Sequence, residues 1–234
     1  MEKLYIVIPA YNEEVMIRSV IEHWYPVVEQ IGVDSRLVVI DDGSRDRTYQ
    51  IVKECMREYP QLIALTKENQ GHGPTVRYGY EYAIAAGADF VFQTDSDGQT
   101  LAEEFPAFWA RRHEYAMVIG HRKHREDGFG RVVVTKVLKA VIGLIFHVNV
   151  TDANTPYRLI RADVLAKQMP LIPEDYNLSN VLVSVIFVKK RLGVLFLPIT
   201  FRPRQGGVNS INVKKIFKLG MRALSDFYKL SKTI

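Results

Sequence analysis

The stretch FVFQTDSDGQ, residues 90–99, decides the class of fold. It begins with the apolar run Phe90–Phe92, which leads through Gln93 and Thr94 into Asp95-Ser96-Asp97. A short, unbroken apolar run that ends in turn residues is typical of a strand buried on both faces of a parallel sheet. Ligands bind such sheets just beyond the carboxyl ends of the strands. The stretch therefore predicts a buried strand that carries two carboxylates to a binding edge.

The same pattern occurs repeatedly on either side of this stretch. Further apolar runs are Leu4–Ile8, Leu37–Ile40, Leu62–Leu65 and Met117–Ile119. Between the runs lie segments with helical spacing, at Glu13–Ile31, Thr48–Tyr59, Thr75–Ala86 and Ala102–His113. Alternating strands and helices predict an α/β fold with a mostly parallel sheet flanked by helices. Polar clusters follow three of the runs, so we expect them to meet at one edge of the sheet.

The second half of the chain has a different pattern. Its segments are a long apolar helix at Val132–Val148, an extended piece at Asp152–Arg161 leading into a helix at Asp163–Gln168, a helix at Leu178–Lys190, a strand at Val194–Phe201 and a basic amphipathic helix at Asn212–Lys232. Neither a repeat nor a linker-like stretch separates this half from the first. We therefore expect a single domain over residues 1–234.

Composition narrows the classes of protein. Of the 234 residues, 47% are hydrophobic and 24% charged, which argues against disorder. The single cysteine argues against a disulfide scaffold. A formal net charge of +5 favours an anionic partner, but the chain has no recognised nucleic-acid-binding motif, so nucleic acid is not expected. The start does not resemble a signal peptide and no apolar run is long enough to span a membrane, so we expect a cytoplasmic protein, at most attached to a membrane surface.

Asp95, Asp97 and Gln99 are the candidate metal ligands, because they follow one another at alternate positions beyond a strand end. Mg²⁺ and Mn²⁺ prefer oxygen ligands and are usually held by one or two carboxylates together with phosphate oxygens. The spacing predicts a divalent cation site, Mg²⁺ or Mn²⁺. The alternative is an ordinary solvated turn, since Asp, Ser and Gly are common turn residues.

Three other polar clusters are candidates for ligand contacts. Tyr11 and Glu13 open the first helix, where a base could stack and a nucleoside could be held. Asp41 and Asp42 end the second run, and the glycine-rich segment Asn69–Thr75, with Gly71, leads into a helix that carries Arg77. Glycines let the backbone approach a diphosphate closely. Each cluster also has a plain structural explanation as a helix start or a turn, and Asn12 is the expected N-cap of the first helix.

The combination is more specific than any part. Pro-Ala-Tyr-Asn-Glu-Glu, then Asp-Asp-Gly-Ser, then Asn-x-Gly-x-Gly, then Asp-x-Asp-x-Gln resembles the family 2 glycosyltransferases. Within that family the chain looks most like the dolichyl-phosphate mannose synthase group, which makes polyprenyl-phosphate sugars. The resemblance implies a GT-A fold, an inverting mechanism and a GDP- or UDP-sugar donor. It also implies a nucleotide-sugar-binding half, 1–120, and an acceptor-binding half, 121–234.

The resemblance also assigns residues. Pro9, Tyr11, Glu13, Asp41 and Asp42 would hold the nucleoside, and Asp95, Asp97 and Gln99 the metal on the diphosphate. In the second half, Arg122 and Arg131 would face an acceptor phosphate, and Arg204 would meet phosphate charge. The segments that end at Arg158 and Ser210 resemble Asp-x-x-Ser-Gly-Phe-Arg and Arg-x-x-Gly-x-Ser, with Thr155-Pro156 in place of Ser-Gly.

The identity of the acceptor determines whether a general base is needed. A lipid phosphate is already ionised near neutral pH, whereas a sugar hydroxyl must lose its proton to a carboxylate. Asp152, Glu174 and Asp175 are the candidate bases. The acceptor most consistent with the resemblance is a polyprenyl phosphate. The alternatives are transfer to a sugar hydroxyl in glycan synthesis, and a protein that binds nucleotide sugars without turnover.

Two segments predict attachment to a membrane surface. The C-terminal segment combines apolar residues such as Phe217, Leu224 and Phe227 with several lysines, as helices in the headgroup plane do. Val132–Val148 is strongly apolar next to a basic stretch. Packing against the protein core or a dimer partner is the alternative for both, and the sequence leaves the oligomeric state open.

Overall fold

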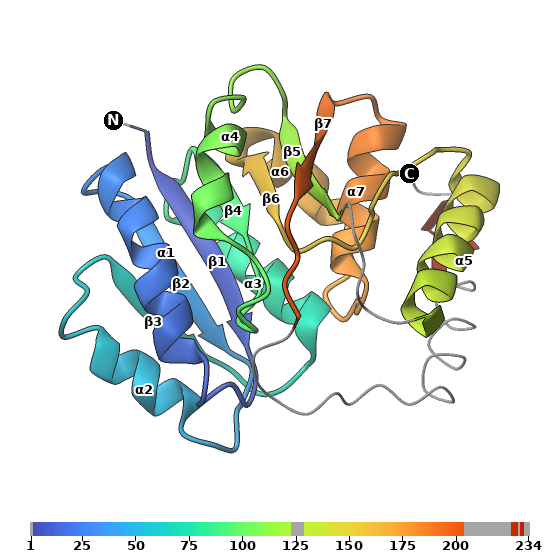
Figure 1. The fold of residues 1–234 in the computed structure, drawn as a ribbon. Helices are drawn as coiled ribbons and strands as arrows, with labels where there is room; N and C mark the ends of the chain where they lie inside the picture. The colour runs from blue at the N-terminus through green and yellow to red at the C-terminus, as the bar shows by residue number, and fades with distance from the viewer. Residues whose placement is uncertain (1, 123–128, 204–225, 229, 232–234) are drawn as a thin grey trace.

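The computed structural model describes residues 2–122, 129–203, 226–228 and 230–231, with the backbone alone for residues 129–136. Its centre is one seven-stranded sheet with the order β3-β2-β1-β4-β6-β5-β7 (Figure 1). The strands are β1 (Leu4–Ala10), β2 (Arg36–Asp41), β3 (Leu62–Thr66), β4 (Phe90–Gln93), β5 (Met117–Arg122), β6 (Arg158–Arg161) and β7 (Val194–Ile199). The sheet confirms the predicted α/β class.

One strand, β6, runs against the others. It pairs antiparallel with both β4 and β5, while every other pair in the sheet is parallel. The carboxyl ends of six strands therefore lie along one edge, and the chain enters β6 at that same edge. The sequence predicted a mostly parallel sheet and an extended piece at 152–161, but gave no direction for β6.

Helices cover both faces of the sheet (Figure 1). On β1, Leu4, Ile6 and Ile8 pack with one set of helices, and Tyr5 and Val7 pack with the other. The first set is α1 (Ile17–Ile31), α2 (Thr48–Cys55) and α4 (Phe105–Trp109). The second set is α3 (His72–Ala85), α6 (Ala162–Gln168) and α7 (Ser179–Lys189). Both faces of β1 are thus buried, as its unbroken apolar sequence predicted.

The first helix begins later than predicted, at Ile17 rather than at Glu13. Asn12 does not cap it: this residue is left-handed, with φ of 54°, and its side-chain oxygen accepts the backbone N–H of Arg45, 2.8 Å away. The segment Ala102–His113 also differs, because it divides into a short 3₁₀ turn, η1 (Ala102–Glu104), and the single-turn helix α4. A second 3₁₀ turn, η2 (Met169–Leu171), follows α6.

Helix α5 (Phe129–Phe146) lies at the β7 side of the molecule, beyond α7 (Figure 1). Phe146 is buried against Phe227 of the C-terminal segment, with ring centroids 5.4 Å apart. For Phe227 the structure therefore shows the alternative that the sequence left open, which is packing against the protein core. On α5 itself Val137 is 57% exposed and Leu144 is 79% exposed. No helix among the described residues is both long and apolar enough to cross a bilayer.

Candidate functional site

The candidate site lies along the sheet edge where the six carboxyl ends meet. Four clusters identified from the sequence follow β1, β2, β3 and β4 there. The second half of the chain adds the end of β5, the loop before β6 and the segment after β7. The topology thus brings both halves of the chain to one edge, where open α/β sheets bind their ligands.

The loops after β1 and β2 are tied to each other. The backbone N–H of Asn12 donates to the Ser44 hydroxyl at 2.9 Å, and that of Glu13 donates to the Thr48 hydroxyl at 2.8 Å. Glu13 is buried, whereas the Tyr11 ring is 42% exposed at the edge. Pro9 is buried inside β1, opposite Ile40. Of these three, Tyr11 is the one that presents an accessible face for stacking.

Asp41 and Asp42 are both 3% exposed and are engaged within the protein. Asp41 accepts the Thr66 hydroxyl at 2.8 Å at the end of β3. Asp42 accepts the Lys67 ammonium at 2.5 Å and the backbone N–H of Gly71 at 2.8 Å. The pair fixes the loop between β3 and α3, a role that the sequence did not predict.

The glycine-rich loop is shaped by its contacts with the second half. Gly71 has a φ of 95°, and a Cβ on Gly73 would lie 2.2 Å from the carbonyl oxygen of Tyr176. Gly73 therefore allows close packing of α3 against residues 176–177, and the predicted role beside a diphosphate is not needed to explain it. Arg77 also differs from its prediction: its Nε donates to the Ile172 carbonyl at 3.0 Å, and its Nη1 lies 2.9 Å from Glu81.

The carboxylates after β4 meet the start of α3. His72 Nε2 lies 2.9 Å from Asp95 Oδ1, and both side chains are partly exposed. Desolvation lowers the pKa of His72, but the charge and hydrogen bond of Asp95 outweigh it and raise the pKa above its usual value. Asp97 Oδ1 accepts the Gln99 backbone N–H at 3.2 Å. His72 was missed as a site residue, and its position between two glycines at a helix start was the available signal.

The Gln99 side chain contacts the segment after β7. Its amide nitrogen donates to the Arg202 carbonyl at 2.7 Å, and the Arg202 backbone N–H donates to the Gln99 carbonyl at 2.9 Å. The sequence predicted Gln99 only as a metal ligand.

Arg122 and Asp152 form a bidentate ion pair. The Arg122 Nε and Nη2 atoms lie 2.9 and 2.8 Å from the two carboxylate oxygens, and the side chains are 11% and 8% exposed. The guanidinium also lies 5.0 Å from the centre of the Phe201 ring. Arg122, which was predicted to face an acceptor phosphate, is thus paired with Asp152, which was predicted as a candidate base.

Arg158, which the sequence analysis expected to contact a substrate, is fully buried. Its guanidinium donates to the carbonyls of Thr155 and Asn180, at 2.5 and 2.8 Å, and to that of Ala153. Burial lowers the pKa of this guanidinium below its usual value. Arg158 joins the loop before β6 to α7, because a buried guanidinium must satisfy its donors inside the protein.

The remaining candidates are placed less fully. Glu174 and Asp175 are exposed, and Glu174 Oε1 lies 3.9 Å from Arg77. Arg204, Ser210 and the side chain of Arg131 lie outside the described residues. The same holds for residues 212–225 of the predicted C-terminal helix.

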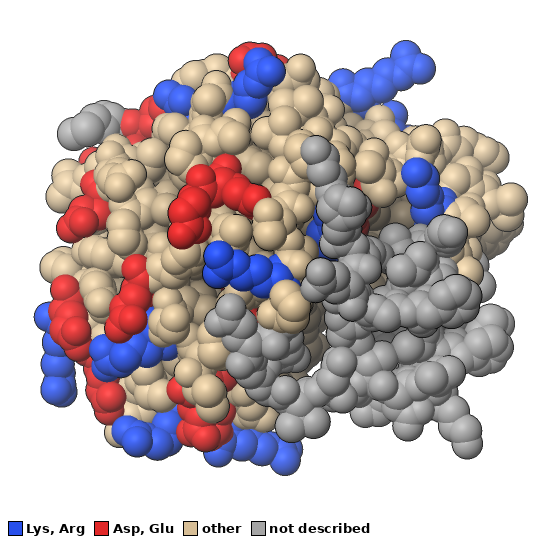
Figure 2. All heavy atoms as spheres, in the orientation of Figure 1, with Lys and Arg blue, Asp and Glu red and all other residues tan. Residues whose placement is uncertain are grey.

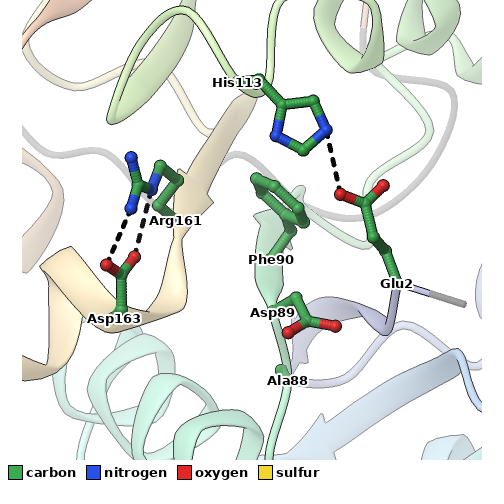
Figure 3. A pocket seen from close by; sticks show the side chains of 7 residues that line it. All are labelled: Glu2, Ala88, Asp89, Phe90, His113, Arg161 and Asp163. Atoms are coloured by element: carbon green, nitrogen blue, oxygen red, sulfur yellow. Dashed lines mark hydrogen bonds and ion pairs between the residues drawn. The ribbon is translucent and has the colours of Figure 1, made fainter.

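A polar hollow of about 580 Å³ lies at the opposite edge of the sheet (Figure 3). Phe90 lies between two ion pairs in it, Arg161 with Asp163 and His113 with Glu2, at 2.8 and 3.0 Å. Phe90 begins β4, Glu2 and His113 precede β1 and β5, and Arg161 ends the antiparallel strand β6, which places the hollow at the amino ends of the parallel strands. It is therefore separate from the candidate site.

The donor set after β4 fits a cation that shares its ligands with phosphate. Among the described residues, no three His, Cys, Asp or Glu side chains are grouped so as to hold a metal by themselves. Asp95 and Asp97 could supply two carboxylate oxygens, and Mg²⁺ or Mn²⁺ usually completes such a set with phosphate and water.

This sheet, with one reversed strand and acidic loops at one edge, defines a GT-A fold. The model of the family "Glycosyl transferase family 2" matches residues 5–168, and the chain belongs to that family. A solved structure, glucosyl-3-phosphoglycerate synthase from Mycobacterium tuberculosis in complex with Mn²⁺, UDP-glucose and phosphoglyceric acid, has a TM-score of 0.71 and 18% identity. That similarity covers 99% of this chain and 80% of the other, and it shows the fold.

Two curated relatives extend over most of the chain. An undecaprenyl-phosphate 4-deoxy-4-formamido-L-arabinose transferase from Pectobacterium carotovorum is 25% identical over 80% of this chain. A dodecaprenyl-phosphate galacturonate synthase from Rhizobium johnstonii is 24% identical over 97% of it. The chain spans 60% of the length of the first and 67% of the second. Both names describe a polyprenyl-phosphate acceptor.

Proposed function

We propose that this protein is an inverting, metal-dependent glycosyltransferase that moves a sugar from a nucleoside-diphosphate sugar to a polyprenyl phosphate. The family, the fold and the named acceptors of the two relatives support the proposal. The observation that carries the choice of acceptor is the Arg122–Asp152 ion pair.

In the proposed reaction, the first half of the chain binds the donor and stabilises the leaving group. Tyr11 stacks on the base, and Asp95 and Asp97 would hold a divalent cation together with the diphosphate. A cation bound there would neutralise charge on the leaving nucleoside diphosphate, and such electrostatic stabilisation is often the largest catalytic contribution. Arg204 adds positive charge to the same group.

The second half of the chain is suited to an acceptor that needs no general base. Asp152 is held in two hydrogen bonds by Arg122, so proton transfer to its carboxylate would break a buried ion pair. Glu174, a second candidate, has a side chain that is 88% exposed and lies beside Arg77. A phosphate monoester is already ionised and attacks the anomeric carbon directly, with no proton to remove.

Product analysis tests the acceptor class. The protein is incubated with Mn²⁺ and each of a set of GDP- and UDP-sugars, with undecaprenyl phosphate, phosphoglycerate or free sugars as acceptor. We expect a lipid-soluble sugar phosphate from undecaprenyl phosphate, at a rate at least about 100-fold above the other acceptors. While Asp152 stays paired with Arg122 it cannot supply a hydroxyl acceptor with the 10²–10⁴-fold contribution of a general base. Faster transfer to phosphoglycerate or a sugar hydroxyl would contradict the proposal.

We also propose that the described part of α5 contacts the membrane that holds such an acceptor. Val137 and Leu144 are exposed two helical turns apart, so they lie on one side of the helix, while Lys139 is exposed on another side of it. A helix with an exposed apolar side and a basic residue on another side suits an anionic lipid surface. On the face shown in Figure 2, in contrast, acidic and basic side chains are interspersed over α1 and α2.

Leu144→Glu tests this contact. We expect the wild-type protein to pellet with vesicles that contain anionic lipid at low salt, and the variant to bind at least about 10-fold more weakly, because a buried leucine side chain contributes about 1.5–3 kcal/mol. Val33→Glu is the matched control, since Val33 is 70% exposed in the turn between α1 and β2, away from α5. Equal pelleting of wild type and both variants would exclude α5 as the contact.

A further inference from the structure

The segment that leaves β7 is held by three separate anchors. The Thr200 backbone N–H donates to both carboxylate oxygens of Glu104, at 2.9 and 3.2 Å. Phe201 lies against the guanidinium of Arg122. Arg202 is held by Gln99 through the reciprocal pair of hydrogen bonds described above. The three anchors come from η1, from β5 and from the loop that carries Asp95 and Asp97.

The orientation of the Gln99 amide follows from its partner. A carbonyl oxygen can only accept a hydrogen bond, so the atom of Gln99 that faces Arg202 must be the amide nitrogen. The amide oxygen of the same group then points away from Arg202, and no hydrogen bond uses it among the described contacts. Gln99 is 6% exposed, and its neighbour Gly98 has a φ of 70°, which fixes the turn between Asp97 and Gln99.

We propose that Gln99 is a positioning residue that couples the cation-binding loop to the chain segment leading to Arg204. Arg204 follows Arg202 by two residues, so the bonds to Arg202 set where that segment begins. A cation on Asp95 and Asp97 would hold the turn in place, because Asp97 also accepts the Gln99 backbone N–H. The Gln99 side chain would in turn hold Arg202 in place through the hydrogen bond to its carbonyl. The inference rests on the proposed function only for the role of Arg204.

Two substitutions separate this role from metal binding. Gln99→Glu keeps oxygens for a cation, but places a carboxylate against the Arg202 carbonyl, where no donor remains. Gln99→Leu replaces the side chain by one of similar size that has neither an oxygen for a cation nor an N–H for the Arg202 carbonyl. If Gln99 positions the segment, both variants lose turnover, while Gln99→Glu retains wild-type Mn²⁺ affinity in the presence of UDP. If Gln99 is only a metal ligand, Gln99→Glu retains both, and the proposal is overturned.

Proteolysis tests the coupling without any turnover. Trypsin does not cut between Arg202 and Pro203, so cleavage after Arg204 reports on this segment, with mass spectrometry identifying the fragment 1–204. We expect this cleavage to accelerate about 10-fold in Gln99→Glu and Gln99→Leu, because Arg202 detaches more often when its hydrogen bond to the Gln99 side chain is lost. Glu103→Gln, on η1 but without a bond to residues 200–202, is the control. Unchanged cleavage in both Gln99 variants would overturn the proposal even if no donor is turned over.

A double-mutant cycle with Arg204→Ala tests the link to catalysis. We expect Gln99→Glu to lower kcat about 30-fold, with little change in donor KM, since small misplacements of a charged group cost up to about 100-fold. In the Arg204→Ala background the same substitution should lower kcat less than about 3-fold, because the group that it positions is gone. An equal loss in both backgrounds would show that Gln99 does not act through Arg204.

Discussion

Replacing Asp97 with alanine should abolish sugar transfer while leaving the protein folded. Asp97 is a partly exposed carboxylate at the carboxyl end of β4, close in the chain to Asp95 and facing the edge where the other strand ends meet. Loss of a cation ligand removes several kcal/mol of transition-state stabilisation, and every 1.36 kcal/mol is a factor of ten in rate. We expect kcat to fall by at least about 10³-fold.

Asp97→Asn separates the charge of this residue from its role in the turn. The asparagine oxygen can still accept the Gln99 backbone N–H, which lies 3.2 Å from Asp97 Oδ1, so the turn should persist. Cation affinity and turnover should nonetheless fall as in Asp97→Ala, because the amide lacks the negative charge. The control is Asp163→Ala, which removes an exposed aspartate from the opposite edge of the sheet and should leave turnover within about 2-fold of wild type.

The measurements are steady-state transfer with increasing Mn²⁺, thermal unfolding, and binding of Mn²⁺ in the presence of UDP. Unfolding temperatures within a few degrees of wild type would show that the loss is chemical. Turnover that persists in EDTA, or in Asp97→Asn at saturating donor, would exclude the proposed cation site.

The sequence was sufficient to predict where the buried strands lie in the chain and at which edge of the sheet the candidate site lies. Leu4–Ile8 and Phe90–Phe92 are buried on both faces, and such strands have unbroken apolar sequences that no surface helix shares. Start positions of helices were less certain. Asn12 is a residue type that often caps helices, but its side chain accepts a hydrogen bond from Arg45 in the loop after β2. A contact between residues 33 positions apart leaves no local signal in the sequence.

The roles of charged residues were the least predictable part. Asp42, Arg77 and Arg158 are types that suit phosphate or nucleoside contacts, yet each has protein partners that lie far away in the sequence. Arg158 shows the physical reason. A buried guanidinium requires several carbonyl acceptors at once, and which loops supply them depends on the tertiary fold rather than on spacing. The sequence motifs therefore predicted the position of the candidate site in the fold better than they predicted the contacts of individual side chains.

Asp152→Ala should strongly destabilise the protein, because it leaves the Arg122 guanidinium nearly buried without its counterion. The side chains are 11% and 8% exposed, and breaking such a pair by removing one partner typically costs about 3–5 kcal/mol. We expect the free energy of unfolding in urea to fall by about 3 kcal/mol, at the lower end of that range because both groups retain some solvent contact. Arg161, whose pair with Asp163 is 42% and 56% exposed, provides the control: Asp163→Ala should cost less than about 1 kcal/mol.

The two possible roles of Asp152 differ in kinetics as well as in stability. A general base contributes about 10²–10⁴-fold, and its removal abolishes the acidic limb of the pH–rate profile. If Asp152 only anchors Arg122, it contributes neither effect. Asp152→Asn, assayed at a temperature where it is folded, should then keep turnover within about 10-fold of wild type and leave the shape of the pH–rate profile unchanged.

The double variant Arg122→Met/Asp152→Leu should recover most of the lost stability, since apolar pairs often replace buried ion pairs without cost. It should still transfer sugar poorly if Arg122 also attracts the acceptor phosphate. If the double variant recovers stability but not turnover, Arg122 binds the acceptor phosphate and Asp152 serves to hold Arg122 in place. A loss of the acidic limb in Asp152→Asn would instead make Asp152 the base and favour a hydroxyl acceptor.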